Sequence, residues 1–234
     1  MSDEKTEDFK KFEEKKKKLV SWITKPENAL LVLILVVAFA LRFHYFIVVA
    51  DQPMWWDEVC YGGLAKNHLT GAWEVPPSMY AGESVIRPPL LPLVWSFLLR
   101  VGIGELGARF LLVLIPSLAS VLFVYLITLE MYNKRVALMS TFIFSTIWIY
   151  LFYSVRLLTG IPSVAFMFAG VYFFVLAMKP KKFNYKFLGI AFFLASISTL
   201  IRFLSGLIFF VFLVMFLIDK RAKLFFKIKL WVYG

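Results

Sequence analysis

Two adjacent carboxylates, Asp57 and Glu58, follow the first long apolar run in the stretch WWDEVCYGG. A carboxylate at the boundary between water and lipid can accept a proton from an attacking hydroxyl, or hold a divalent cation over a phosphate, and the low dielectric strengthens either interaction. The structural alternative for Asp57 is a helix N-cap, a role worth about 1 kcal/mol. The residue types alone favour neither role.

Three arginines could supply the cation that such chemistry needs. Arg87 precedes two prolines that hold the backbone extended, in the stretch VIRPPLLPL. A guanidinium grips a phosphate through two parallel hydrogen bonds. Arg156 and Arg202 stand at the ends of apolar runs, where a cation in lipid needs an anionic partner. The alternative for all three is a charge that snorkels to the interface.

The composition is that of a membrane protein, because 61% of the 234 residues are hydrophobic, 18% are aromatic and the mean hydropathy is +0.78. The single cysteine, Cys60, and the two histidines, His44 and His68, rule out a Cys/His zinc site. The net charge of +11 comes from basic clusters between apolar runs. This placement is a topology signal and argues against a nucleic-acid partner.

The apolar runs predict an all-α, polytopic integral membrane bundle. We expect about six transmembrane helices, at residues 29–49, 109–131, 136–153, 161–178, 187–201 and 207–218. The run 88–101 is short for a span and predicts an interfacial helix. Apolar residues at helical spacing from Asp57 to Leu69, followed by Gly71 as a C-cap, predict a second interfacial helix.

The charges orient this bundle. Residues 1–27 form a charged tail that we expect in the cytoplasm, and residues 28–234 form the transmembrane module, with an external loop at 51–108. The path puts every basic cluster on one side of a plasma or endoplasmic-reticulum-type membrane. No cleavable signal peptide is visible. The chain stops as another apolar segment begins, which predicts a fragment of a longer enzyme or a short member of a larger group.

Three stretches together resemble the N-terminal membrane half of the GT-C glycosyltransferases: WWDEVCYGGLAKNHLTG, then RPPLLPLVWSFLLRVGIGELGARFLLVLIPSLASVLFVYLI, then YSVRLLTGIPSVAFMFAG. The likeness covers about residues 30–218. It is strongest to the branch that includes protein O-mannosyltransferases and the aminoarabinose transferase of lipid A. These enzymes take a sugar from a polyprenyl-phosphate lipid and give it to a lipid or protein acceptor on the external face.

The resemblance implies roles for individual residues. Asp57, with Glu58 beside it, would be the catalytic carboxylate that acts as base or orients the acceptor. Arg87 would bind the lipid phosphate, and we expect further substrate contacts from Tyr61, Arg156 and Arg202. Because phosphate is already a good leaving group, one base and one cation suffice for an inverting displacement.

One position departs from the family pattern. Where the family commonly carries a second acid, in a setting R-x-x-x-D-x-P, this chain has Gly160 between Arg156 and Pro162. Asp57 is then the one expected ligand of a Mg²⁺ or Mn²⁺ ion, so either Glu58 or another group replaces the missing acid, or metal binding and activity are both weakened.

Two other readings stay open. The chain could be a non-catalytic relative that acts as a lipid-binding or partner subunit, as the departure at Gly160 suggests. A small transporter is a third reading, although the acids lie in a loop and not at the middle of the membrane, where transport sites are expected. The residues do not identify the sugar or the acceptor.

Overall fold

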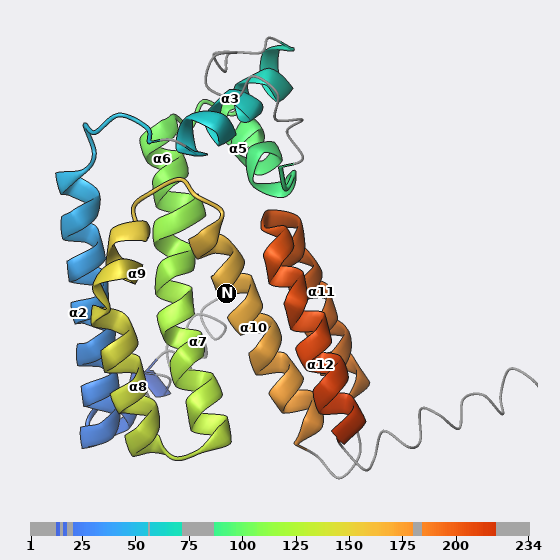
Figure 1. Cartoon of the computed structure of the whole chain (residues 1–234). Coiled ribbons are helices and arrows are strands. Elements are labelled where there is room, and N and C mark those ends of the chain that lie inside the picture. The colour runs from blue at the N-terminus through green and yellow to red at the C-terminus, as the bar shows by residue number, and fades with distance from the viewer. Residues whose placement is uncertain are drawn as a thin grey trace, which may run out of the picture.

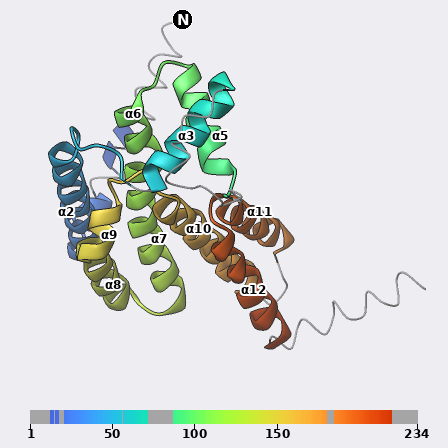
Figure 2. The same ribbon diagram turned by 45° about the horizontal axis from the view of Figure 1, so that its top comes forward.

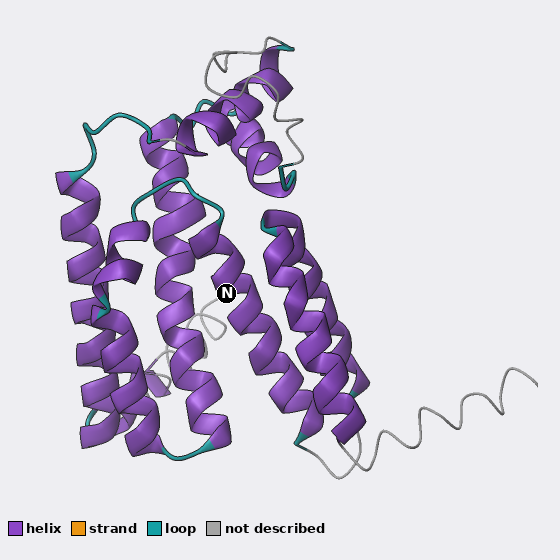
Figure 3. Ribbon diagram, viewed as in Figure 1, coloured by secondary structure: helices purple, strands orange, loops and turns teal. Residues whose placement is uncertain are grey.

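The computed structural model describes residues 13–14, 16–17, 21–55, 57–71, 87–179 and 184–218. In these residues the regular elements are all helices, joined by short loops (Figure 3). This confirms the predicted all-α membrane bundle. The predictions for most of the tail, for Trp56 and for the basic segment after Ile218 fall outside the described residues.

Three helices are long and apolar enough to cross a membrane by themselves. The first, α2 (Pro26–Val48), begins with a proline, whose missing N–H has no helical partner at that position anyway. The second runs without interruption from α6 (Glu105–Arg109) through a π-helical turn (Phe110–Leu114) into α7 (Ile115–Met131). The third is α10 (Gly160–Met178). All three coincide with predicted spans.

The predicted span at 136–153 is broken. It consists of α8 (Lys134–Thr146) and α9 (Trp148–Tyr153), separated by Ile147 in an extended conformation with ψ 116°. The hydroxyls of Ser145 and Thr146 both donate to the carbonyl of Phe142, at 2.7 and 3.1 Å. Such bonds from hydroxyl to backbone compete with the helical ladder and can bend helices, and here they stand directly before the interruption.

The last two predicted spans form a hairpin of shorter apolar helices. It comprises α11 (Tyr185–Ile201), a single 3₁₀ turn (Phe203–Gly206) and α12 (Leu207–Ile218). The Asn184 side chain accepts a hydrogen bond from the Phe187 amide and so caps the start of α11. Neither helix of the hairpin is long enough to span a membrane on its own.

The long helices run up and down beside one another, so their loops gather at two ends of the bundle (Figure 1). At one end lie the carboxyl end of α2, the loop between α9 and α10, and the turn between α11 and α12. Two further helices, α3 (Asp57–Thr70) and α5 (Leu90–Arg100), pack against each other across this end (Figure 2). They are the helices predicted in the first loop, and Gly71 follows α3 with φ 72°, as a C-cap glycine does.

Candidate active site

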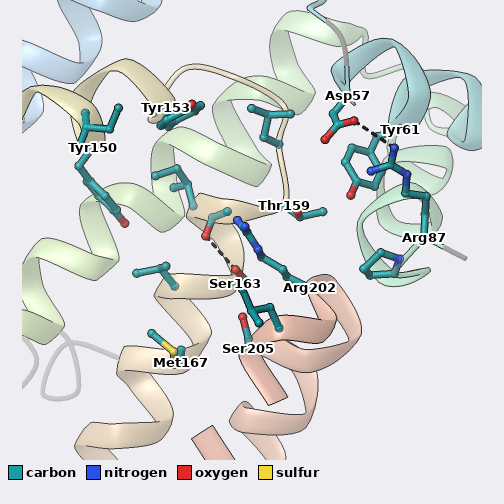
Figure 4. Close-up of a pocket in the computed structure, with 17 residues that line it drawn as sticks. Asp57, Tyr61, Arg87, Tyr150, Tyr153, Thr159, Ser163, Met167, Arg202 and Ser205 are labelled. Carbon is teal, nitrogen blue, oxygen red and sulfur yellow. Dashed lines mark hydrogen bonds and ion pairs between the residues drawn. The ribbon is translucent and has the colours of Figure 1, made fainter. Parts of the chain in front are cut away.

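A cavity of about 810 Å³ opens where α3 meets the bundle (Figure 4). Its walls come from α3, the segment before α5, α9, the start of α10 and the turn after α11. One part of the lining is polar and charged, and the rest is apolar, with Ile149, Val164, Met167 and Leu204 contributing. A cavity with one charged wall and one apolar wall suits a lipid whose headgroup carries a charge.

Asp57 and Arg87 form an ion pair at this cavity, with Oδ1 and Nη2 3.2 Å apart (Figure 4). The Asp57 side chain is 47% exposed and the Arg87 side chain 24% exposed, so both are open to a ligand. The guanidinium also lies over the ring of Tyr61, 5.8 Å from its centroid. Three predicted site residues, two from α3 and one from the segment before α5, therefore meet on one wall.

Arg87 keeps its positive charge in this setting. Burial lowers the pKa of Arg87, but the Asp57 carboxylate, together with Cys60 and Tyr61, outweighs that effect and holds the pKa above its ordinary value. The cavity therefore has a cation at any physiological pH.

Glu58 points the other way and is completely buried. Its Oε2 accepts a hydrogen bond from the Trp55 amide at 2.9 Å, and its Oε1 accepts one from the Leu157 amide at 2.6 Å. Arg156 Nη1 lies 3.5 Å from Oε2. Glu58 is not among the residues that line the cavity. Its partners connect the first residues of α3 to the loop between α9 and α10.

Arg156 is buried with Glu58 and does not line the cavity either. Its Nη2 donates to the side-chain carbonyl of Gln52, and its guanidinium lies 4.9 Å from the centroid of the Trp55 ring. Both contacts are to the segment between α2 and α3. The structure therefore brings two of the predicted site residues, Glu58 and Arg156, together behind the cavity and not in it.

Arg202 extends into the cavity from the end of α11 (Figure 4). A Cβ atom built on Gly160, the first residue of α10, would lie 3.2 Å from Arg202 Nη1. Within the described residues Arg202 forms no ion pair. The two positions singled out in the sequence, the departure at Gly160 and the cation at Arg202, are thus direct neighbours.

The donor set does not fit a divalent cation held between two carboxylates. Among the described residues that line the cavity, Asp57 is the one acid, and its carboxylate is paired with Arg87. The place of the second acid is taken by Gly160, which faces a guanidinium. Nowhere in the described part of the chain do three or more His, Cys, Asp or Glu residues gather as a metal site would require.

Several residues of the site were not predicted. Tyr150, Tyr153 and Thr159 line the cavity, the first two because the break at Ile147 turns α9 toward it. Arg109, which is 1% exposed, donates to the backbone carbonyls of Val49 and Gln52 at 3.1 and 3.2 Å and so holds the exit of α2. A signal for Arg109 was present, since Glu105 lies four residues earlier and pairs with it at 2.5 Å.

A comparison with known families places this site in context. The family model described as dolichyl-phosphate-mannose-protein mannosyltransferase matches residues 86–234, more than half of the chain. No curated protein and no solved structure matches. The matched segment contains Arg87, Arg156, Gly160 and Arg202, and it begins after Asp57. The match confirms the GT-C resemblance, and a membrane glycosyltransferase of this kind uses a dolichyl-phosphate-linked sugar as donor. The chain belongs to the dolichyl-phosphate-mannose-protein mannosyltransferase family.

Proposed function

We propose that the chain transfers a sugar from a dolichyl- or polyprenyl-phosphate carrier to a lipid or protein acceptor on the extracytoplasmic face, with Asp57 as the general base. The observation that carries the proposal is the ion pair of Asp57 and Arg87 at the mouth of a cavity that Arg202 also enters. A base and two cations share one space, as transfer from a lipid phosphate requires.

The reaction is a single displacement. The Asp57 carboxylate accepts the proton of the acceptor hydroxyl, and the hydroxyl oxygen attacks the anomeric carbon of the sugar. The bond from that carbon to the phosphate oxygen breaks, and its electron pair stays on the phosphate. Arg87 and Arg202 stabilise the negative charge that develops there. Attack from the side opposite the phosphate inverts the anomeric centre.

Pairing with Arg87 makes the base sensitive to the donor. The Arg87 guanidinium lies 3.2 Å from Asp57 Oδ1 and so occupies one oxygen of the carboxylate. A donor phosphate competes for the same guanidinium. Its binding would loosen the pair and leave the Asp57 carboxylate free to accept the proton of the acceptor hydroxyl.

Glu58 and Arg156 take supporting roles in this proposal. Their burial and their contacts with Trp55, Gln52 and Leu157 favour positioning of the start of α3 over contact with substrate. A rigid buried partner behind a catalytic residue limits how far that residue can drift. Glu58 would hold Asp57 toward the cavity, and Arg156 would neutralise Glu58.

The test is sugar transfer by the full chain in lipid vesicles that contain labelled dolichyl-phosphate mannose. We expect Asp57→Asn to lower the transfer rate about a hundredfold or more, because general-base catalysis contributes on that order. Asp51→Asn is the matched control, since Asp51 is exposed and does not line the cavity. Transfer by Asp57→Asn at the wild-type rate would remove Asp57 from the mechanism.

A lipid-binding relative without catalysis is the second candidate. The observation that favours it is that Gly160, beside Arg202, stands where the second acid is expected. The same vesicles separate the two. A chain that retains the labelled carrier lipid but never releases the sugar from it, even at high acceptor concentration, is a binding protein. Release of the sugar that depends on Asp57 identifies the enzyme.

A further inference from the structure

The backbone around Arg202 fixes where its side chain starts. Its amide donates to the carbonyl of Ser198 in the last turn of α11, at 2.9 Å, and its carbonyl accepts from the Ser205 amide in the following 3₁₀ turn, also at 2.9 Å. Arg202 itself has extended dihedrals, φ −150° and ψ 113°, between these two helices. The backbone of Arg202 is therefore held by a hydrogen bond on each side, which fixes the position from which its side chain extends.

The contact between α11 and α10 then sets the distance from Arg202 to Gly160. Ser198 Oγ, one turn before Arg202, donates to the carbonyl of Ser163 at 2.8 Å, within the first turn of α10. Further down the pair, a Cβ on Gly170 would lie 3.2 Å from the carbonyl oxygen of Ala191, so the two backbones are almost in contact. The guanidinium and the first residue of α10 are positioned by helix packing, independently of any ligand.

The charges at this place are not balanced. Among the described residues that line the cavity, three side chains are ionised: Asp57 and Arg87 neutralise each other, which leaves the charge of Arg202 in excess within this set. An acid at position 160 would stand against Nη1 and remove that excess. Glycine leaves the guanidinium both its space and its charge.

We propose that Gly160 admits Arg202 to the position where an acid would otherwise hold a divalent cation, so that this chain binds the phosphate of its carrier lipid without a divalent metal. The inference rests on the proposed function of the cavity as the donor site. A guanidinium can supply both the charge and the hydrogen bonds that the ion would give to phosphate oxygens. Position 160 is thus a determinant of how the phosphate is recognised.

The experiment measures binding of citronellyl phosphate to the purified full chain in detergent micelles, by titration calorimetry, in EDTA and in excess Mg²⁺. We expect wild type to bind with the same Kd within about twofold in both, and Gly160→Asp to bind about tenfold more weakly in EDTA, since its carboxylate would pair with Arg202. Mg²⁺ should restore binding by Gly160→Asp. Gly160→Ala is the control, because its Cβ meets only the flexible end of Arg202.

A tenfold loss of wild-type affinity in EDTA, reversed by Mg²⁺, would overturn the proposal without any variant. So would tight metal-free binding by Gly160→Asp. Inorganic phosphate should bind more weakly than citronellyl phosphate, and equal affinity would overturn the assignment to a lipid headgroup. The assay contains no acceptor and follows no transfer, so its failure is distinguishable from a failure of the proposed function, which is measured by Asp57-dependent release of sugar.

Discussion

At the scale of single residues, the buried ion pair of Glu58 and Arg156 is the feature on which the site geometry depends most. A buried pair adds little net stability, because desolvation of both charges offsets their attraction, yet loss of one partner leaves the other charge uncompensated. Glu58 also accepts two backbone N–H groups, which would lose their partners together with the charge. The pair is therefore a point of high sensitivity.

We predict that Glu58→Gln destabilises the chain by about 3 kcal/mol or more, since it leaves the Arg156 guanidinium buried without a counter-charge. The readout is the thermal unfolding midpoint in detergent micelles. Lys134→Gln is the matched control, because it removes an ion pair, with Glu27 at 2.8 Å, that lies on the surface. Its midpoint should stay close to that of wild type. A similar shift of the midpoint in both variants would show that loss of the buried pair costs no more stability than loss of the surface pair, and would refute the prediction.

The sequence predicted which residues of the site carry charge but not which way they face. Asp57, Arg87 and Arg202 could be expected in one space because each stands at the end of an apolar run on the same side. The burial of Glu58 could not, since its partners Arg156 and Leu157 are 98 and 99 positions away. A contact that far apart in the sequence leaves no periodicity to detect.

At the scale of elements, α10 and α11 are joined by small residues. In a membrane, close approach of backbones replaces the hydrophobic effect as the main source of helix association. Gly170 lies at the closest point, against the Ala191 carbonyl and the Ala195 amide of α11. Backbone atoms cannot rotate away from an added side chain, so this contact leaves no room for adjustment.

We predict that Gly170→Leu destabilises the bundle by about 1–3 kcal/mol, as overpacking does, and also lowers sugar transfer because Arg202 moves away from Gly160. The control is Gly189→Leu in α11, where an added Cβ would meet nothing within 4 Å. The unfolding midpoint and the transfer rate should both be lower for Gly170→Leu than for Gly189→Leu. Equal behaviour would mean that the helix contact does not position the cation.

Element boundaries were predictable where a local signal exists. The start and end of α3 follow from the helical spacing of its apolar residues and from Gly71, and the short run at 88–101 forms α5, which is too short for a span. The break between α8 and α9 has neither proline nor glycine to mark it. The Ser145 hydroxyl bonds to the preceding turn just before the break, but Ser196 and Thr199 make the same kind of bond inside the unbroken α11. Residues of this type therefore do not mark a break in the sequence.

At the scale of the whole molecule, the two ends of the bundle differ in chemistry. The end with the cavity holds Asp57, Arg87 and Arg202. The opposite end holds the surface ion pairs of Lys134 with Glu27 and of Lys179 with Glu130. From the positive-inside rule and the basic clusters of the sequence we propose that the second end lies in the cytoplasm. The site would then face the other compartment, as the proposed function requires.

We predict that a membrane-impermeant maleimide labels Asp51→Cys in intact cells but labels Tyr132→Cys only after the membrane is disrupted. Both positions are exposed. Asp51 follows the carboxyl end of α2 and Tyr132 follows the carboxyl end of α7, and these two helix ends lie at opposite ends of the bundle (Figure 1). The background is Cys60→Ser, which removes the single, buried native thiol. If both cysteines react in intact cells, or if only Tyr132→Cys does, the orientation is wrong.

The hydrogen bonds from Arg109 and Arg156 to Gln52 have a consequence for biosynthesis. The segment that carries Asp57, the proposed catalytic carboxylate, leaves the ribosome early. The groups that hold this segment belong to Arg109, Arg156 and Leu157, which are translated much later. Until the segment with Arg156 is in place, burial of Glu58 would leave its carboxylate without a counter-charge. The proposed active centre therefore cannot be complete before the loop between α9 and α10 has been synthesised and has reached the start of α3.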